Sequence, residues 1–174
     1  MRRPSTSAKS ASVPAIPHEQ CPAKTFMTDA GDVTLGRSVF NHCQIVGEVA
    51  KALSDRYVGS SAACLFPYGS ELIAACHDIG KVSPTFVAKL LRAANYHPHS
   101  YPSLANIDSS LERQWGGHAG VSQVAAKAMK VPARIPEILG QHHGYSPPVA
   151  DKRAHDEGFG GPAWQEERVR LADA

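Results

Sequence analysis

Apolar residues recur at helical spacing through most of the chain. From Ser38 to Tyr57 apolar residues fall at every third or fourth position, which places them on the same side of a helix as His42. Ser38 can cap the start of this helix. This pattern predicts a helix from Ser38 to about Tyr57, whose face with His42, Val49 and Leu53 packs inward.

The next predicted helix is apolar on all sides. It runs from about Ser70 through Leu, Ile, Ala and Cys residues to the pair His77 and Asp78, and Gly80 ends it. A helix without a polar face is typical of a buried position, so we expect this helix to be central to the fold.

Four further helices are predicted, one of them with a serine cap followed by a first-turn proline. Their ranges are Ser83 to about Ala94, about Gly117 to Lys130, Ile135 to His142, and Pro162 to the C-terminus. The intervening segments 95–114 and 145–161 resemble loops, and 25–37 is expected to be a short extended or irregular segment. Because no convincing strand appears, the predicted class is all-α, without internal repeats.

Composition places the chain among ordinary globular domains. Its 174 residues are 43% hydrophobic and 20% charged, which suits one domain with a real core. No apolar run approaches a membrane-spanning length, and no apolar segment follows Arg2 and Arg3, so we expect a cytoplasmic location and no membrane contact. A net charge of +2 is too small to indicate nucleic-acid binding by itself.

The N-terminal residues differ from the rest. Residues 1–24 are rich in Ser, Pro and Ala without periodicity, so we expect a flexible tail followed by one domain at residues 25–174. None of the four cysteines forms a CxxC pair, and three lie in apolar surroundings, which favours buried free thiols over disulfides.

The candidate chemistry is centred on His77 and Asp78. An imidazole nitrogen and a carboxylate oxygen can both bind a divalent cation, and a carboxylate can bridge two. Lys81, one turn later, could meet an anion held by that metal. Four more histidines lie in segments that are predicted to be helical: His42, His118, His142 and His143. This set favours a metal-dependent phosphohydrolase.

Each histidine also has a plain structural interpretation. A histidine on an inward face, such as His42, is more often a satisfied core residue, and His118 after two glycines suits an ordinary helix start. His142 and His143 would interact well with a helix C-terminus if they were cationic. The other four are expected at the surface: His18, His97, His99 and His155.

Four motifs carry a family resemblance. In chain order they are NHCQIVGEVAKAL, CHDIGKVSPTF, GGHAGVS and QHHG. Together they closely resemble the HD nuclease domain of the CRISPR-associated nuclease-helicase of type I systems, within the HD phosphohydrolase superfamily. The likeness runs from about residue 25 to residue 164.

The resemblance implies a helical bundle that holds two metals. By motif position, His42, His77 and Asp78 would hold the first metal. Asp78 would bridge to the second, completed by His118, His142 and His143, and Lys81 would contact the scissile phosphate. The implied activity is hydrolysis of single-stranded DNA in CRISPR interference. A helicase module would feed the strand after recruitment by the RNA-guided surveillance complex.

The types of ligand atom limit which metals are expected to bind. Five imidazoles and one carboxylate suit transition metals better than the all-oxygen shell that Mg²⁺ prefers. We therefore expect two divalent transition metals, with Fe, Mn, Ni or Co ahead of Zn and Mg. Because imidazole must be neutral to bind a metal, activity should fall in acid.

One departure from the family pattern concerns the end of the chain. Relatives carry a late aspartate in an apolar helix that completes the first metal site. Here Asp173 follows an alanine, but residues 166–170 are too polar for a buried helix, and no GxxxxGK[ST] motif occurs. We expect a domain that lacks its C-terminal helices, with a weaker first metal, a better occupied second metal and an apolar face that needs a partner.

Two other functions remain open at this point. The missing aspartate and helicase favour a non-catalytic HD module that binds CRISPR components, whereas the intact histidine set favours the nuclease. A weaker alternative is an HD hydrolase that acts on nucleotides and prefers a nucleoside phosphate to a DNA strand.

Overall fold

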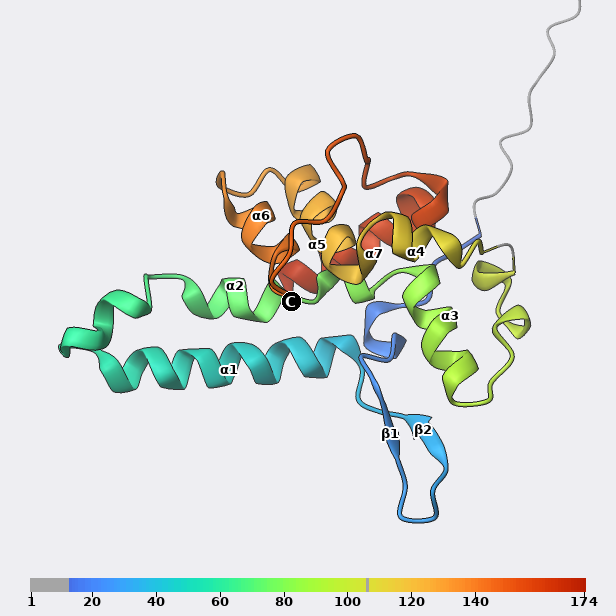
Figure 1. The fold of residues 1–174 in the computed structure, drawn as a ribbon, viewed down its shortest axis with the longest axis horizontal. Coiled ribbons are helices and arrows are strands. Elements are labelled where there is room, and N and C mark those ends of the chain that lie inside the picture. Colours follow the sequence, from blue (N-terminus) through green and yellow to red (C-terminus); the bar gives the residue numbers. More distant parts are fainter. Residues whose placement is uncertain (1–12, 106) are drawn as a thin grey trace, which may run out of the picture.

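The structure, a computed structural model, describes residues 13–105 and 107–174. Within these residues helices dominate, which confirms the predicted all-α class (Figure 1). No helix of this described part is both long and apolar enough to cross a bilayer. The helices are α1 (Val39–Tyr57), α2 (Ser70–Cys76), α3 (Pro84–Ala93), α4 (Ser110–Gln114), α5 (Gly117–Ala128), α6 (Ile135–Gly140) and α7 (Gly161–Asp173).

One small sheet interrupts the helical pattern. Strands β1 (Thr25–Met27) and β2 (Val33–Leu35) pair antiparallel, with Thr25 opposite Leu35, and the hairpin extends away from the helices (Figure 1). Three-residue strands are too short for a period-two pattern to stand out, so the sequence predicted only an extended or irregular segment here.

Two helix starts follow the sequence signals. The Ser38 hydroxyl accepts a hydrogen bond from the Asn41 N–H at 3.2 Å at the start of α1. Ser83 does the same for the Phe86 N–H at 3.4 Å, with Pro84 in the first turn of α3. Both caps are confirmed, because capping depends on residues that are close in sequence.

Helix α2 is not central, contrary to the prediction. It has no buried residue, and Leu72 is 66% exposed. Helix α2 packs mainly against α1, and only Ile73 and Cys76 pack against the buried core, to which α3 and α5 contribute most. Burial begins directly after α2, at Asp78, Ile79 and Gly80.

Helix α1 is also less buried than its pattern suggested. Val49 is 56% exposed and Leu53 is 43% exposed, so the expectation of a fully inward face is wrong beyond its first turns. In Figure 1, α1 and α2 lie side by side and extend beyond the other helices. Gly47 permits this close approach, because a Cβ there would lie 2.9 Å from the Ala75 Cβ.

The expected N-terminal tail, residues 1–24, divides in two. Residues 1–12 lie outside the described residues. Residues 13–24 pack against the domain: Cys21 is fully buried and Ala23 is 2% exposed. His18, which was expected at the surface, is buried. Its backbone nitrogen and its Nδ1 each lie 3.0 Å from the Oε2 atom of Glu167 in α7. The part of this segment that the structure describes therefore lies against the helices.

Helix α7 has one buried side, which includes two charged residues. Arg168 is 0% exposed, and its guanidinium donates to the carbonyl oxygens of Val82 and Ala154, both at 2.9 Å, and to Gln165 at 2.8 Å. The expectation that residues 166–170 are too polar for a buried helix is wrong for Glu167 and Arg168, whereas the other three residues are exposed. The hydrogen bonds of Arg168 satisfy its buried charge. Asp173, at the end of α7, is exposed.

The four cysteines are free thiols, as the sequence predicted. Cys21 and Cys43 are buried and Cys76 is half-buried, whereas Cys64 is exposed. Burial raises the pKa of the Cys43 thiol to about 12, so this thiol stays protonated near neutral pH.

Candidate metal centre

Asp78 lies where the chain leaves α2. The helix ends at Cys76, and a 3₁₀ turn, Ile79–Lys81, follows at once, so the carboxylate points into the domain and the residue is 2% exposed. Gly80 packs directly on α5, because a Cβ at this position would overlap the carbonyl oxygen of His118. The sequence His-Asp-x-Gly thus brings the backbone of the turn onto the helix that carries His118.

Ser122 of α5 holds this turn on both sides of Asp78. Its hydroxyl donates to the His77 carbonyl oxygen at 3.0 Å and accepts from the Gly80 N–H at 2.9 Å. Ser122 is fully buried. The sequence interpretation did not identify this residue, although it stands one turn after His118 in the GGHAGVS motif.

Replacing Ser122 by alanine should lower the free energy of unfolding by about 1–3 kcal/mol, because the Gly80 N–H loses its partner in a buried place. The affinity for a transition metal should fall about tenfold, because Asp78 is held less firmly. Urea denaturation and calorimetric metal titration measure the two effects. Ser110→Ala, at an exposed position on α4, is the matched control. Unchanged metal affinity in Ser122→Ala would contradict the positioning role.

One carboxylate oxygen of Asp78 contacts two imidazole rings and one ammonium group. The Oδ2 atom lies 2.9 Å from His42 Nε2, 2.9 Å from His77 Nε2 and 2.7 Å from Lys81 Nζ. His42 comes from α1, so this group joins that helix to a turn 36 residues further along the chain. The side chains of His42 and His77 are about a quarter exposed, which leaves the group accessible from outside.

The other oxygen of Asp78 faces the remaining histidines. The Oδ1 atom lies 3.1 Å from His118 Nε2 of α5 and 3.5 Å from His142 Nε2, just after α6. His143 Nε2 lies 3.0 Å from His118 Nε2. The structure thus brings together every residue of the predicted site around one carboxylate, with His143 reached through His118.

The imidazoles are oriented by backbone carbonyl oxygens. Nδ1 of His77 lies 2.7 Å from the Ala74 oxygen, and Nδ1 of His142 lies 2.6 Å from the Leu139 oxygen. A carbonyl oxygen only accepts, so each Nδ1 carries the hydrogen and each neutral ring presents the lone pair of Nε2. This is the arrangement that metal-binding histidines usually have.

Two buried atoms of the site have no hydrogen-bond partner with suitable geometry in the described residues. They are Asp78 Oδ1 and His142 Nε2. A buried acceptor without a partner is costly, and a cation between the two atoms would satisfy both. Two groups have ligand atoms close enough to share one ion: His42, His77 and Asp78, and His118, His142 and His143. The donor set therefore fits metal binding at two adjacent positions.

Burial and neighbouring charges set the protonation of the site. Burial would raise the pKa of Asp78, but His118, His77 and Lys81 outweigh it and hold the pKa well below its usual range. Burial lowers the pKa of His42 and of His142, which favours the neutral ligand form. Burial opposes charge on His77 too, yet the adjacent Asp78 carboxylate prevails and raises the pKa of His77.

A third group with metal-binding atom types lies elsewhere, at His18, Glu19 and Glu167. Here the carboxylate oxygens of Glu167 are already engaged by His18 and Arg170. Burial opposes ionisation of Glu167, but these partners lower its pKa. The group therefore joins the N-terminal segment to α7 as an internal polar contact.

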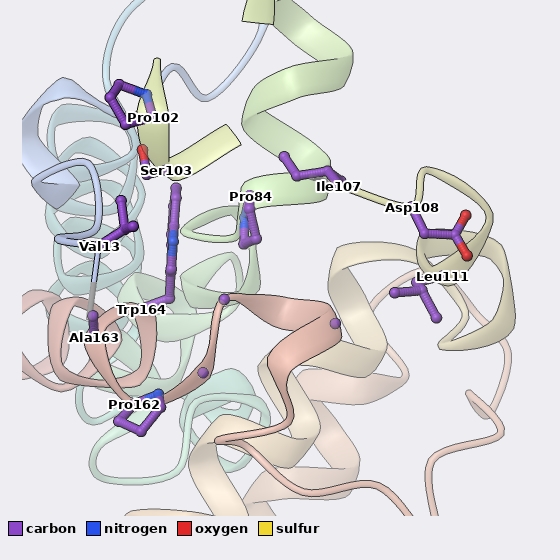
Figure 2. Close-up of a pocket in the computed structure, with 13 residues that line it drawn as sticks. Val13, Pro84, Pro102, Ser103, Ile107, Asp108, Leu111, Pro162, Ala163 and Trp164 are labelled. Carbon is purple, nitrogen blue, oxygen red and sulfur yellow. The ribbon is translucent and has the colours of Figure 1, made fainter. Parts of the chain in front are cut away.

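A pocket of about 550 Å³ lies apart from the predicted site (Figure 2). Trp164, Pro84, Pro102 and Leu111 contribute to its walls, and none of the predicted site residues lines it. The pocket is thus separate from the histidine cluster.

A helical domain that gathers five imidazoles around one buried aspartate from a His-Asp pair has the arrangement typical of an HD domain. The family model described as "Cas3, HD domain" matches residues 23–174, and the chain belongs to this family. No curated protein and no solved structure matches the chain. Family membership implies a metal-dependent nuclease domain of a type I CRISPR system.

Proposed function

We propose that this chain is a metal-dependent nuclease that hydrolyses phosphodiesters of single-stranded DNA in CRISPR interference. The observation that carries the proposal is the position of Asp78, whose two oxygens face two separate groups of imidazoles. One carboxylate shared between two ligand groups is the arrangement that a two-metal phosphodiesterase needs.

The ligand roles follow the two groups. His42, His77 and Asp78 would hold one metal, and His118, His142 and His143 would hold the other together with Asp78. The second position has four candidate ligands and is therefore the better occupied. When bound, two such metals supply an activated water and stabilise the negative charge that develops at phosphorus. The nitrogen-rich donors favour Fe, Mn, Ni or Co.

The protein residues prepare the site for an anionic strand. Lys81 places a positive charge 2.7 Å from Asp78, and its side chain is 13% exposed, which suits contact with the scissile phosphate. The Nζ atom also lies 5.6 Å from the centre of the Phe86 ring, which restricts where the ammonium can move. Lys89, further along α3, pairs with Glu112 at 3.2 Å and adds less to this surface.

The proposal includes the cellular context that the family implies. The strand would be supplied in the cytoplasm by a helicase module, after recruitment by an RNA-guided surveillance complex. A domain that cuts a strand fed from a helicase needs an open site, and the quarter-exposed side chains of His42 and His77 are in keeping with this need.

The function is tested with circular single-stranded DNA, which only an endonuclease can open. The chain is purified without air, its bound metals are counted, and Mn²⁺, Fe²⁺, Ni²⁺ or Mg²⁺ is supplied. We expect linear products with the transition metals, weak or no cleavage with Mg²⁺, and none after chelation.

Other outcomes identify the alternatives. Two bound metals without any cleavage would favour a module that acts by binding CRISPR components. Release of phosphate from nucleoside phosphates, with DNA left intact, would favour a nucleotide hydrolase. Either result would overturn the nuclease proposal.

A further inference from the structure

Tyr145 is anchored beside the histidine cluster. Its hydroxyl donates to the Gly116 carbonyl oxygen at 2.9 Å, next to the start of α5. Gln141 and Ser146 close the turn around it with a side-chain hydrogen bond of 3.0 Å. Pro147 packs on Gly116 so closely that a Cβ there would lie 2.8 Å from the proline Cβ. The ring is therefore anchored at its hydroxyl and on both sides of its backbone.

The ring of Tyr145 remains open although it is anchored. The residue is 50% exposed. Its ring lies nearly parallel to that of His143, with an angle of 15° and a centroid separation of 6.5 Å. His143 in turn lies 3.0 Å from His118 between their Nε2 atoms. An accessible aromatic ring thus lies two residues beyond His143, next to the candidate metal centre.

The chemistry of this ring limits what it can bind. Its hydroxyl already donates a hydrogen bond to Gly116, so the flat apolar face of the ring is the part that is available to a ligand. A single strand whose phosphate reaches the metal centre carries unstacked bases on both sides of that phosphate. Every nucleobase offers a flat face, and base–aromatic stacking is a main source of affinity for single strands.

We propose that Tyr145 is a stacking platform for one nucleobase next to the cleaved phosphodiester. This inference rests on the proposed nuclease function and adds to it a base-binding subsite. Because stacking is available to all four bases, the subsite requires a base without selecting its identity.

The test is an abasic scan. A set of oligonucleotides, each lacking one base at a different position around a fixed cleavage site, is cut by the manganese-loaded chain. One position should raise KM about tenfold in the wild type, since one stacked base contributes about that much. In Tyr145→Ala the intact strand should show the same rise in KM with kcat little changed, and the abasic penalty at that position should disappear.

Two variants serve as controls. Tyr145→Phe keeps the ring and should retain the abasic penalty, whereas Tyr96→Ala removes another tyrosine that is also 50% exposed and should change nothing. Circular dichroism and thermal unfolding verify that each variant is folded. A Tyr145→Ala chain that keeps the wild-type abasic penalty would overturn the stacking platform and leave the nuclease function intact.

The two proposals can fail separately. If the metal-loaded chain binds DNA without cutting it, the nuclease proposal fails. The same abasic scan, followed by fluorescence anisotropy, then decides on the subsite. If no oligonucleotide binds, both proposals are overturned.

Discussion

Replacing Asp78 by asparagine is expected to lower metal-dependent DNA cleavage by about 10³-fold or more, which corresponds to about 4 kcal/mol of transition-state stabilisation. The amide keeps the shape of the carboxylate but loses its charge and one of its two acceptor oxygens. Since Oδ1 and Oδ2 face different imidazole groups, both candidate metal positions are weakened by one substitution.

The measurement combines cleavage rates with a count of bound metals. The wild type should bind two metals, and Asp78→Asn should bind fewer, with reduced affinity at both positions. Asp29→Asn, at an exposed position in the hairpin turn, is the matched control and should behave as the wild type. Full cleavage by Asp78→Asn would contradict the bridging role and the proposed function with it.

Replacing Arg168 by alanine is expected to destabilise the domain by about 3–5 kcal/mol, a large share of the stability of a typical domain. The side chain is fully buried, so its removal leaves a cavity and two buried carbonyl oxygens, of Val82 and Ala154, without their donors. Burial lowers the pKa of Arg168 to about 9, so loss of the buried charge offsets part of this cost.

Urea denaturation measures the effect of Arg168. Arg168→Met separates the two causes, because methionine fills much of the cavity but donates no hydrogen bonds. If the hydrogen bonds dominate, methionine should be nearly as damaging as alanine. Arg92→Met, at an exposed position on α3, should change stability by less than about 0.5 kcal/mol. An unchanged midpoint for Arg168→Ala would show that α7 is not held through this residue.

The predicted helices agree best with the structure where their signals are local. Ser38, Ser83 and Pro84 act on backbone groups within three residues, so helix starts could be predicted from the chain alone. The ends of helices were less accurate. The helix expected to reach His77 and Asp78 stops at Cys76, because the chain turns there to pack Gly80 on α5.

Burial could not be predicted as well as helix position. The apolar α2 is only partly covered, whereas Glu167 and Arg168 of the polar α7 are buried. A hydrophobicity pattern indicates which side of a helix could be buried, but not how much partner surface is present. Nor does it show that distant carbonyl oxygens will satisfy a buried guanidinium. His18 was misplaced at the surface for the same reason.

The sequence by itself determined the helical class, the main helix starts and the kinds of donor atoms available, since these depend on residue type and short-range spacing. Only the tertiary structure decided that histidines from four separate segments meet at the two oxygens of Asp78, and that Tyr145 stands open beside them. The physical reason is that side chains distant in sequence become neighbours only through helix packing, to which Gly47, Gly80 and Ser122 contribute contacts.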